Sequence, residues 1–105
     1  MSTSNIKTKL QQIVEDEIAR SIEKHGPLNS RHEAYAVMLE EYEEANDELQ
    51  ALKIYMDGFW SDIKRNKRNE YMPQSILKYS INAAVELIQV AAMAEKFMQQ
   101  EAKKE

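Results

Sequence analysis

The sequence predicts an all-α protein, an antiparallel bundle of about four helices in a single domain over residues 1–105. Apolar residues recur at steps of three and four along most of the chain, as on one face of an α-helix. The chain has only two Gly and two Pro and few Val or Thr, so it is poor in residues typical of turns and strands. With 105 residues, of which 43 % are hydrophobic, its core is small and would gain from a partner surface.

The first helix is predicted over residues 4–25. Six aliphatic residues repeat there at helical spacing: Ile6, Leu10, Ile13, Val14, Ile18 and Ile22. The helix should end at His25-Gly26-Pro27, because Gly suits the position after a helix and Pro cannot continue one.

A second helical region is predicted from residue 31. Ser30 and Glu33 have the spacing of a capping box, in which Ser30 accepts from the Glu33 amide and the Glu33 carboxylate reaches back to the Ser30 amide. The apolar stripe then continues past Gly58, which weakens a helix by about 1 kcal/mol relative to Ala. Either one helix reaches to about Lys67 or a break falls near Asp57-Gly58. We favour a helix that continues or bends at that point, with segments over about 31–56 and 57–68.

The last helix is predicted over residues 74–100, with Pro73 in a first-turn position. It has one apolar face and a set of small residues that permit close packing, namely Ala83, Ala84, Ala91, Ala92 and Ala94.

Composition excludes several classes of function. The chain has no Cys, so a disulfide framework, a thiol nucleophile and a thiolate metal site are excluded. A net charge of −4 argues against binding a nucleic acid polymer. The sequence shows no apolar run of membrane-spanning length and no signal peptide, so we expect a cytoplasmic protein without membrane contact.

Carboxylates collect on two of the predicted helices. Successive helical residues turn by about 100°, which places Glu41 and Glu44 along one border of the buried face of the second helix. Glu86 lies among apolar neighbours on the last helix, where its charge needs compensation. A salt bridge to another helix would supply it, and so would a cation shared with Glu41 and Glu44. Carboxylates from two helices suit Mg²⁺ or Mn²⁺.

The motif E-E-x-x-E at Glu40–Glu44, followed by Glu86-Leu87-Ile88-Gln89 on a later apolar helix, resembles the MazG-like, all-α nucleoside triphosphate pyrophosphohydrolases, in particular small phage-encoded members. The resemblance implies a helical bundle that works as a homodimer or homotetramer. It also implies Mg²⁺-dependent cleavage of (deoxy)nucleoside triphosphates to nucleoside monophosphate and pyrophosphate.

The resemblance assigns roles residue by residue. Glu41, Glu44 and Glu86 match the metal-binding glutamates, and Gln89 stands where the family has Asp. Gln offers a neutral oxygen in place of a charge, which predicts weaker metal binding. Beyond direct ligation, Glu40 or Glu44 is the candidate to orient or deprotonate the attacking water.

Substrate contacts are predicted at Lys64, Arg65, Lys67, Lys78, Asn82 and Trp60. A structural explanation competes for several of them, because cations favour a helix C-terminus and aromatic residues at helical spacing usually belong to a core. The alternative to an enzyme is a catalytically weak or inactive helical protein that binds nucleotide or a protein partner.

Overall fold

The computed structural model describes residues 3–104, and within them the protein is all-α, as predicted. It has three helices: α1 (Thr3–His25), α2 (Arg31–Lys64) and α3 (Tyr71–Ala102). No strand occurs in these residues. The prediction of about four helices is wrong for the single chain, because the expected helices 31–56 and 57–68 are one continuous helix.

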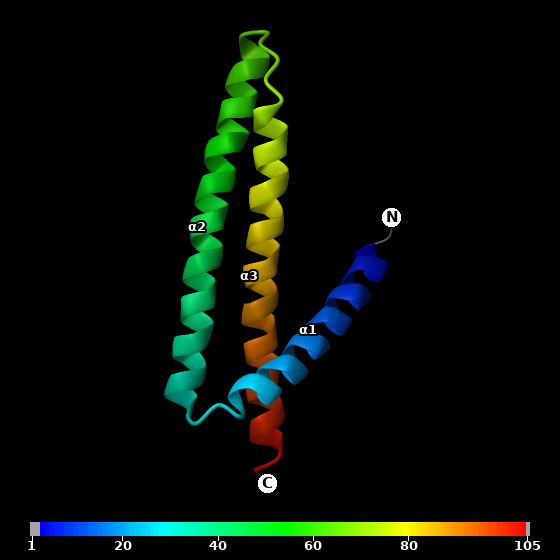
Figure 1. The fold of residues 1–105 in the computed structure, drawn as a ribbon, viewed down its shortest axis with the longest axis vertical. Coiled ribbons are helices and arrows are strands. Elements are labelled where there is room, and N and C mark those ends of the chain that lie inside the picture. The colour runs from blue at the N-terminus through cyan, green and yellow to red at the C-terminus, as the bar shows by residue number, and fades with distance from the viewer. Residues whose placement is uncertain (1–2, 105) are drawn as a thin grey trace.

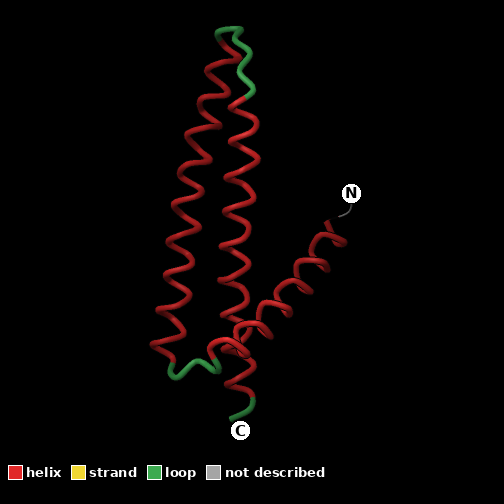
Figure 2. Tube along the Cα trace, viewed as in Figure 1, coloured by secondary structure: helices red, strands yellow, loops and turns green. Residues whose placement is uncertain are grey.

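Helices α2 and α3 form a long antiparallel hairpin, and α1 crosses the C-terminal half of α3 (Figure 1). The two loops lie at opposite ends of this hairpin (Figure 2). The molecule measures 62 × 30 × 20 Å, so it is a rod rather than a sphere. The N-terminal part of α1 leans away from the hairpin (Figure 1).

The end of α1 follows the sequence signals. Gly26 has φ of 70°, a left-handed conformation that favours Gly, and its amide donates to the Ile22 carbonyl at 2.8 Å. This turn directs the short segment 26–30 away from α1 and into α2.

The predicted capping box at the start of α2 is half confirmed. Ser30 has extended dihedrals, and its Oγ accepts from the Glu33 amide at 3.0 Å. The Glu33 carboxylate accepts from the Asn29 amide at 3.2 Å instead of from Ser30. Glu33 is therefore occupied at the helix terminus.

Gly58 marks a close approach of two helices, not a break in α2. A Cβ at this position would lie 3.0 Å from the Met72 sulfur of α3. The absence of a side chain thus lets Met72 pack against the α2 backbone. Sequence reasoning sees the helix-weakening effect of Gly but not the Met72 side chain that packs over it from α3, which explains the wrong boundary at residue 57.

The turn between α2 and α3 is built by local hydrogen bonds. Asn66 has φ of 55°, and the amides of Asn66 and Lys67 donate to the carbonyls of Ile63 and Asp62. This pattern is a Schellman motif with Asn in the left-handed position. The Asn69 side chain then accepts from the Tyr71 amide at 2.9 Å, so α3 begins three residues before the predicted start and keeps Pro73 in its first turn.

The core lies where α1 meets the hairpin. Ile18 of α1 is buried against Ala92 and Met93 of α3. Three partly buried residues pack around them, namely Val14, Val37 and Met38. Elsewhere the buried residues of the hairpin are mainly alanines, which allow α2 and α3 to approach closely.

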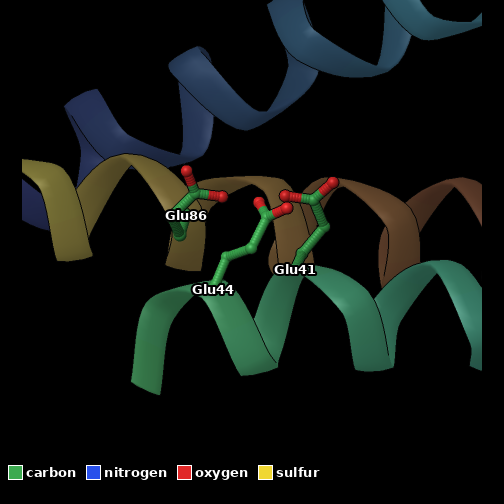
Figure 3. A group of neighbouring side chains, drawn as sticks. All are labelled: Glu41, Glu44 and Glu86. Carbon is green, nitrogen blue, oxygen red and sulfur yellow. The ribbon is translucent and has the colours of Figure 1, made fainter. Parts of the chain in front are cut away.

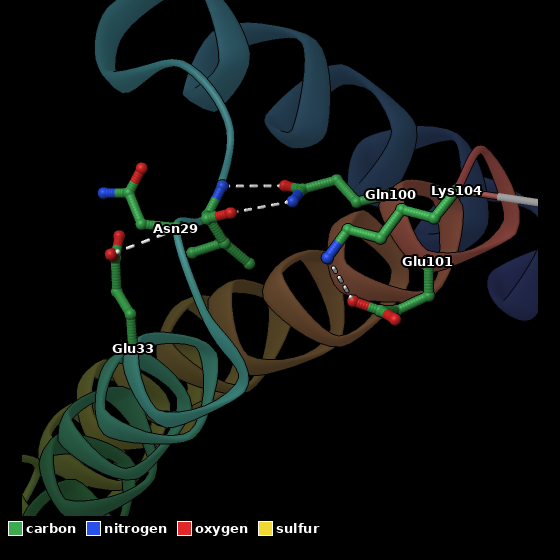
Figure 4. Close-up of polar contacts among 6 residues, drawn as sticks. Asn29, Glu33, Gln100, Glu101 and Lys104 are labelled. Atoms are coloured by element: carbon green, nitrogen blue, oxygen red, sulfur yellow. Dashed lines mark hydrogen bonds and ion pairs between the residues drawn. The ribbon is translucent and has the colours of Figure 1, made fainter.

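A side-chain clamp fixes the loop that connects α1 and α2. Gln100 of α3 accepts from the Leu28 amide at 2.8 Å and donates to the Leu28 carbonyl at 2.9 Å (Figure 4). Both backbone groups of Leu28 are thereby satisfied by one side chain. The clamp ties the loop between the end of α1 and the start of α2 to α3.

Much apolar surface remains uncovered. The accessible surface is 8187 Å², against about 6,100 Å² for a compact monomer of this mass. The radius of gyration is 17.7 Å, where a compact domain of this length has about 13 Å. The most exposed large apolar residues include Ile54, Trp60, Tyr71, Leu77 and Met98.

Helix α3 is more apolar than the sequence reading expected. An 18-residue window of it has mean hydropathy 1.2, and by length and composition alone it could cross a membrane. Core helices of soluble proteins meet the same criterion, and both other helices pack on α3. Only 17 % of that window is buried, so most of its residues remain partly or fully accessible.

Candidate metal centre

Glu41 and Glu44 of α2 and Glu86 of α3 meet in one cluster. One carboxylate oxygen of each residue lies within 4.8 Å of those of the other two. Figure 3 shows the three side chains converging between the hairpin helices on the side that α1 crosses. The helical projection from the sequence placed Glu41 and Glu44 on one border of the second helix, and the structure brings Glu86 of the last helix next to them.

The cluster is electrostatically unfavourable without a cation. Hydrogen bonding with Glu86 and the negative charge of that residue raise the pKa of the Glu44 carboxyl. Burial raises the pKa of the Glu86 carboxyl, and its hydrogen bond with Glu41 raises it further. Two raised pKa values in one cluster indicate carboxylates that are crowded together, a condition that a bound cation relieves.

The donor set fits a divalent cation of the Mg²⁺ type. All three ligands are carboxylate oxygens, which suit hard cations. Mg–O distances of about 2.1 Å allow coordinated oxygens to be at most about 4.2 Å apart. The widest separation allowed by the 4.8 Å limit would therefore need a closure of about 0.6 Å. Glu44 is exposed and free to make such an adjustment.

The acidic residues next to the cluster differ in their surroundings. Glu40, the candidate to position water, is exposed on α2, and its charge contributes to the raised pKa of Glu44. Glu48 accepts a hydrogen bond from the Asn82 side chain at 3.2 Å. Asn82 was predicted to contact substrate, and in this structure it links α3 to α2 on the α2 border that also carries the cluster.

Gln89 has a partner that sequence reasoning missed. Its Nε2 donates to a carboxylate oxygen of Glu17 in α1 at 2.9 Å, and the other oxygen of Glu17 accepts from Arg20 at 2.9 Å. The Glu17 side chain is only 16 % exposed. Gln89 therefore links α3 to α1, and its amide nitrogen is occupied by Glu17.

The structure does not bring the predicted basic contacts to the carboxylates within one chain. Lys64 and Arg65 lie at the far end of α2, some twenty residues or about 30 Å along the helix from Glu44. There the Lys64 ammonium lies 5.6 Å from the centroid of the Trp60 ring, and Lys67 lines an open hollow in the loop that follows.

Lys78 is closer to the cluster than that loop but points elsewhere. Its ammonium lies 5.3 Å from the centroid of the Tyr79 ring, and it precedes Glu86 on α3 by about 12 Å.

A cavity of about 340 Å³ lies beside the carboxylates and is lined by all three helices. Glu41 and Gln89 line it from the hairpin. Five polar or charged residues of α1 line it as well, namely Glu17, Arg20, Ser21, Lys24 and His25. These residues were not selected from the sequence, because charges at the end of an amphipathic helix are usually solvated.

Comparisons of the chain with protein-family models, with curated proteins and with solved structures find no match. The resemblance to MazG-like enzymes therefore remains a prediction that rests on the two motifs.

Proposed function

We propose that the protein is a Mg²⁺-dependent nucleoside triphosphate pyrophosphohydrolase of the MazG-like type. The observation that carries the proposal is the convergence of Glu41, Glu44 and Glu86 from two helices to within 4.8 Å. These residues belong to the two motifs on which the family resemblance rests. The adjoining cavity provides room for a ligand next to Glu41.

In this proposal Glu41, Glu44 and Glu86 hold Mg²⁺, with Mn²⁺ as a substitute, and the oxygen of Gln89 is a fourth, neutral ligand. Bound there, the metal would supply neutralisation of phosphate charge and alignment of the attacking water. A carboxylate, Glu40 or Glu44, would accept the proton of that water. A bond from the water oxygen to phosphorus would replace the anhydride bond between the α- and β-phosphates, and the products would be nucleoside monophosphate and pyrophosphate.

The proposal includes self-association as a homodimer or homotetramer. The chain exposes about 2,000 Å² more surface than a compact monomer of its mass, which is the scale that an obligate interface buries. Glu86 lies near the middle of the apolar helix α3, and a carboxylate at that position is costly in a bilayer. A second copy of the chain is therefore a better cover for this surface than lipid.

A second candidate function is favoured by the contact of Gln89 with Glu17. In the resembling family a carboxylate stands at this position, whereas here an amide links α3 to α1. A site with one charge fewer would bind the metal more weakly. The alternative is therefore a catalytically weak or inactive helical protein that binds nucleotide or a protein partner.

The experiment that separates the two is pyrophosphate release from a panel of nucleoside triphosphates, with Mg²⁺, with Mn²⁺ and with chelator. The enzyme predicts metal-dependent release that Glu41→Gln abolishes and that the exposed control Glu43→Gln leaves intact. Gln89→Asp should raise activity if the site is a weakened metal centre. Release from no triphosphate, in the wild type or in Gln89→Asp, would support the non-catalytic protein.

A further inference from the structure

The cavity beside the carboxylate cluster is lined by charged side chains of both signs. Glu41 on α2, one member of the cluster, lines it together with Glu17 of α1. The last two turns of α1 add Arg20, Ser21, Lys24 and His25 to the lining. Glu17 is already engaged by Gln89 and Arg20, so a ligand in this cavity would meet the basic groups of α1 close to the cluster residue Glu41.

A buried lysine adds positive charge next to the α1 residues that line the cavity. Lys96 of α3 is 2 % exposed, and its Nζ donates to the Ser21 hydroxyl at 2.7 Å. It forms no ion pair among residues 3–104, although burying an ammonium group without a counter-charge is costly. Burial lowers the pKa of the Lys96 ammonium, and the charge of Glu33 partly opposes this effect. An anion next to Ser21 would stabilise the charged form.

Arg20 is available to exchange its present partner. Its side chain is 71 % exposed and its ion pair with Glu17 is therefore weak, worth about 0–1 kcal/mol. A phosphate group can accept two parallel hydrogen bonds from the Arg guanidinium, and this bidentate contact is stronger than an exposed ion pair with a carboxylate. Arg20 already lines the cavity in its present position.

We propose that this cavity is a polyphosphate subsite, in which Arg20 and Lys24 bind the phosphate groups that lie beyond the metal at Glu41, Glu44 and Glu86. This inference rests on the proposed function and adds to it the residues that hold the charged part of the substrate. It replaces the basic residues at the hairpin turn, which lie about 30 Å from the cluster within one chain. His25 and the Ser21 hydroxyl complete the wall of the subsite.

The test is calorimetric titration of the full-length protein with inorganic pyrophosphate, in the presence of Mg²⁺ and in chelator. The double variant Arg20→Gln/Lys24→Gln should bind pyrophosphate at least about tenfold more weakly than the wild type, since two charge-assisted contacts are lost. The matched control is Lys7→Gln/Lys9→Gln, which removes two exposed charges about 16 Å or more away along the same helix. This control should bind within about twofold of the wild type.

Three results would overturn the subsite: no binding of pyrophosphate by the wild type, equal binding by the Arg20/Lys24 variant, or a loss in Lys64→Gln/Lys67→Gln but not in the Arg20/Lys24 variant. Circular dichroism of each variant checks that α1 remains folded. If the protein hydrolyses a triphosphate with metal but its binding of pyrophosphate does not depend on Arg20 and Lys24, the subsite is overturned and the proposed enzyme is not. Pyrophosphate binding that depends on these residues, without hydrolysis of any triphosphate, would overturn the proposed enzyme alone.

Discussion

Replacing Glu86 with Gln should stabilise the metal-free protein and remove its response to Mg²⁺. The three carboxylates approach one another within 4.8 Å, and at that separation two unit charges repel by about 0.9 kcal/mol even in bulk water. Glu86→Gln has nearly the same shape and removes the repulsion with Glu41. Unfolding free energy in chelator at pH 7 should therefore rise by about 1 kcal/mol, a shift of roughly 4 °C or more in Tm for a domain of this size.

Mg²⁺ should stabilise the wild type more than the Glu86→Gln variant. At a Mg²⁺ concentration of about one hundred times Kd, the wild type gains about 2.7 kcal/mol, whereas the variant lacks one of three charged ligands. Thermal unfolding followed by circular dichroism, at one protein concentration with and without Mg²⁺, measures both effects. Glu43→Gln, which removes an exposed charge of α2, is the control. A variant that is less stable than the wild type in chelator, or equally stabilised by Mg²⁺, would refute the reasoning.

Three further predictions concern pH and the helices. The folded-state pKa values of Glu44 and Glu86 are raised above 4.5, so the folded protein binds more protons than the unfolded one just above that pH, and this contribution to stability falls as pH rises. The extra stability of Glu86→Gln in chelator should thus shrink towards pH 4.5. Calorimetry should find that the affinity for Mg²⁺ increases from pH 5 to 8, and an affinity that does not change with pH would exclude competition between protons and Mg²⁺. Gly58→Ala should raise the unfolding free energy measured in urea by about 0.5 kcal/mol, because the gain of helix propensity exceeds the cost of moving the flexible end of Met72. A loss of unfolding free energy above about 1 kcal/mol would mean that Met72 cannot move. Ser30→Ala should lower the same quantity by about 1 kcal/mol through loss of the hydrogen bond to the Glu33 amide, and an unchanged value would show that this cap contributes nothing.

Local signals predicted the helices well because their causes are local. Gly26 ends α1 and Ser30 starts α2 through contacts within four residues along the chain. Gly58 was misread because its role depends on Met72, which approaches from another helix. The exposure of α3 was likewise not predictable, since composition does not tell how much of an apolar face a short α1 covers.

For the candidate site as well, features with local causes were predicted and features that depend on helix packing were not. Helical periodicity placed Glu41 and Glu44 on one border, and the apolar surroundings of Glu86 marked it as unusual, so the cluster followed from the sequence. Periodicity does not tell where α1 crosses α3. The contact of Gln89 with Glu17 and the position of Arg20 beside Glu41 depend on that crossing.

The central claim is that Glu41, Glu44 and Glu86 together hold a divalent cation. Anomalous diffraction from a crystal of the wild-type protein grown with Mn²⁺ tests it most directly. We predict an anomalous peak about 2.2 Å from a carboxylate oxygen of each of the three residues, with the peak lost in Glu86→Gln crystals grown in the same way. Mn²⁺ bound elsewhere on the chain with no peak at this cluster, or a peak that persists unchanged in Glu86→Gln, would contradict the account.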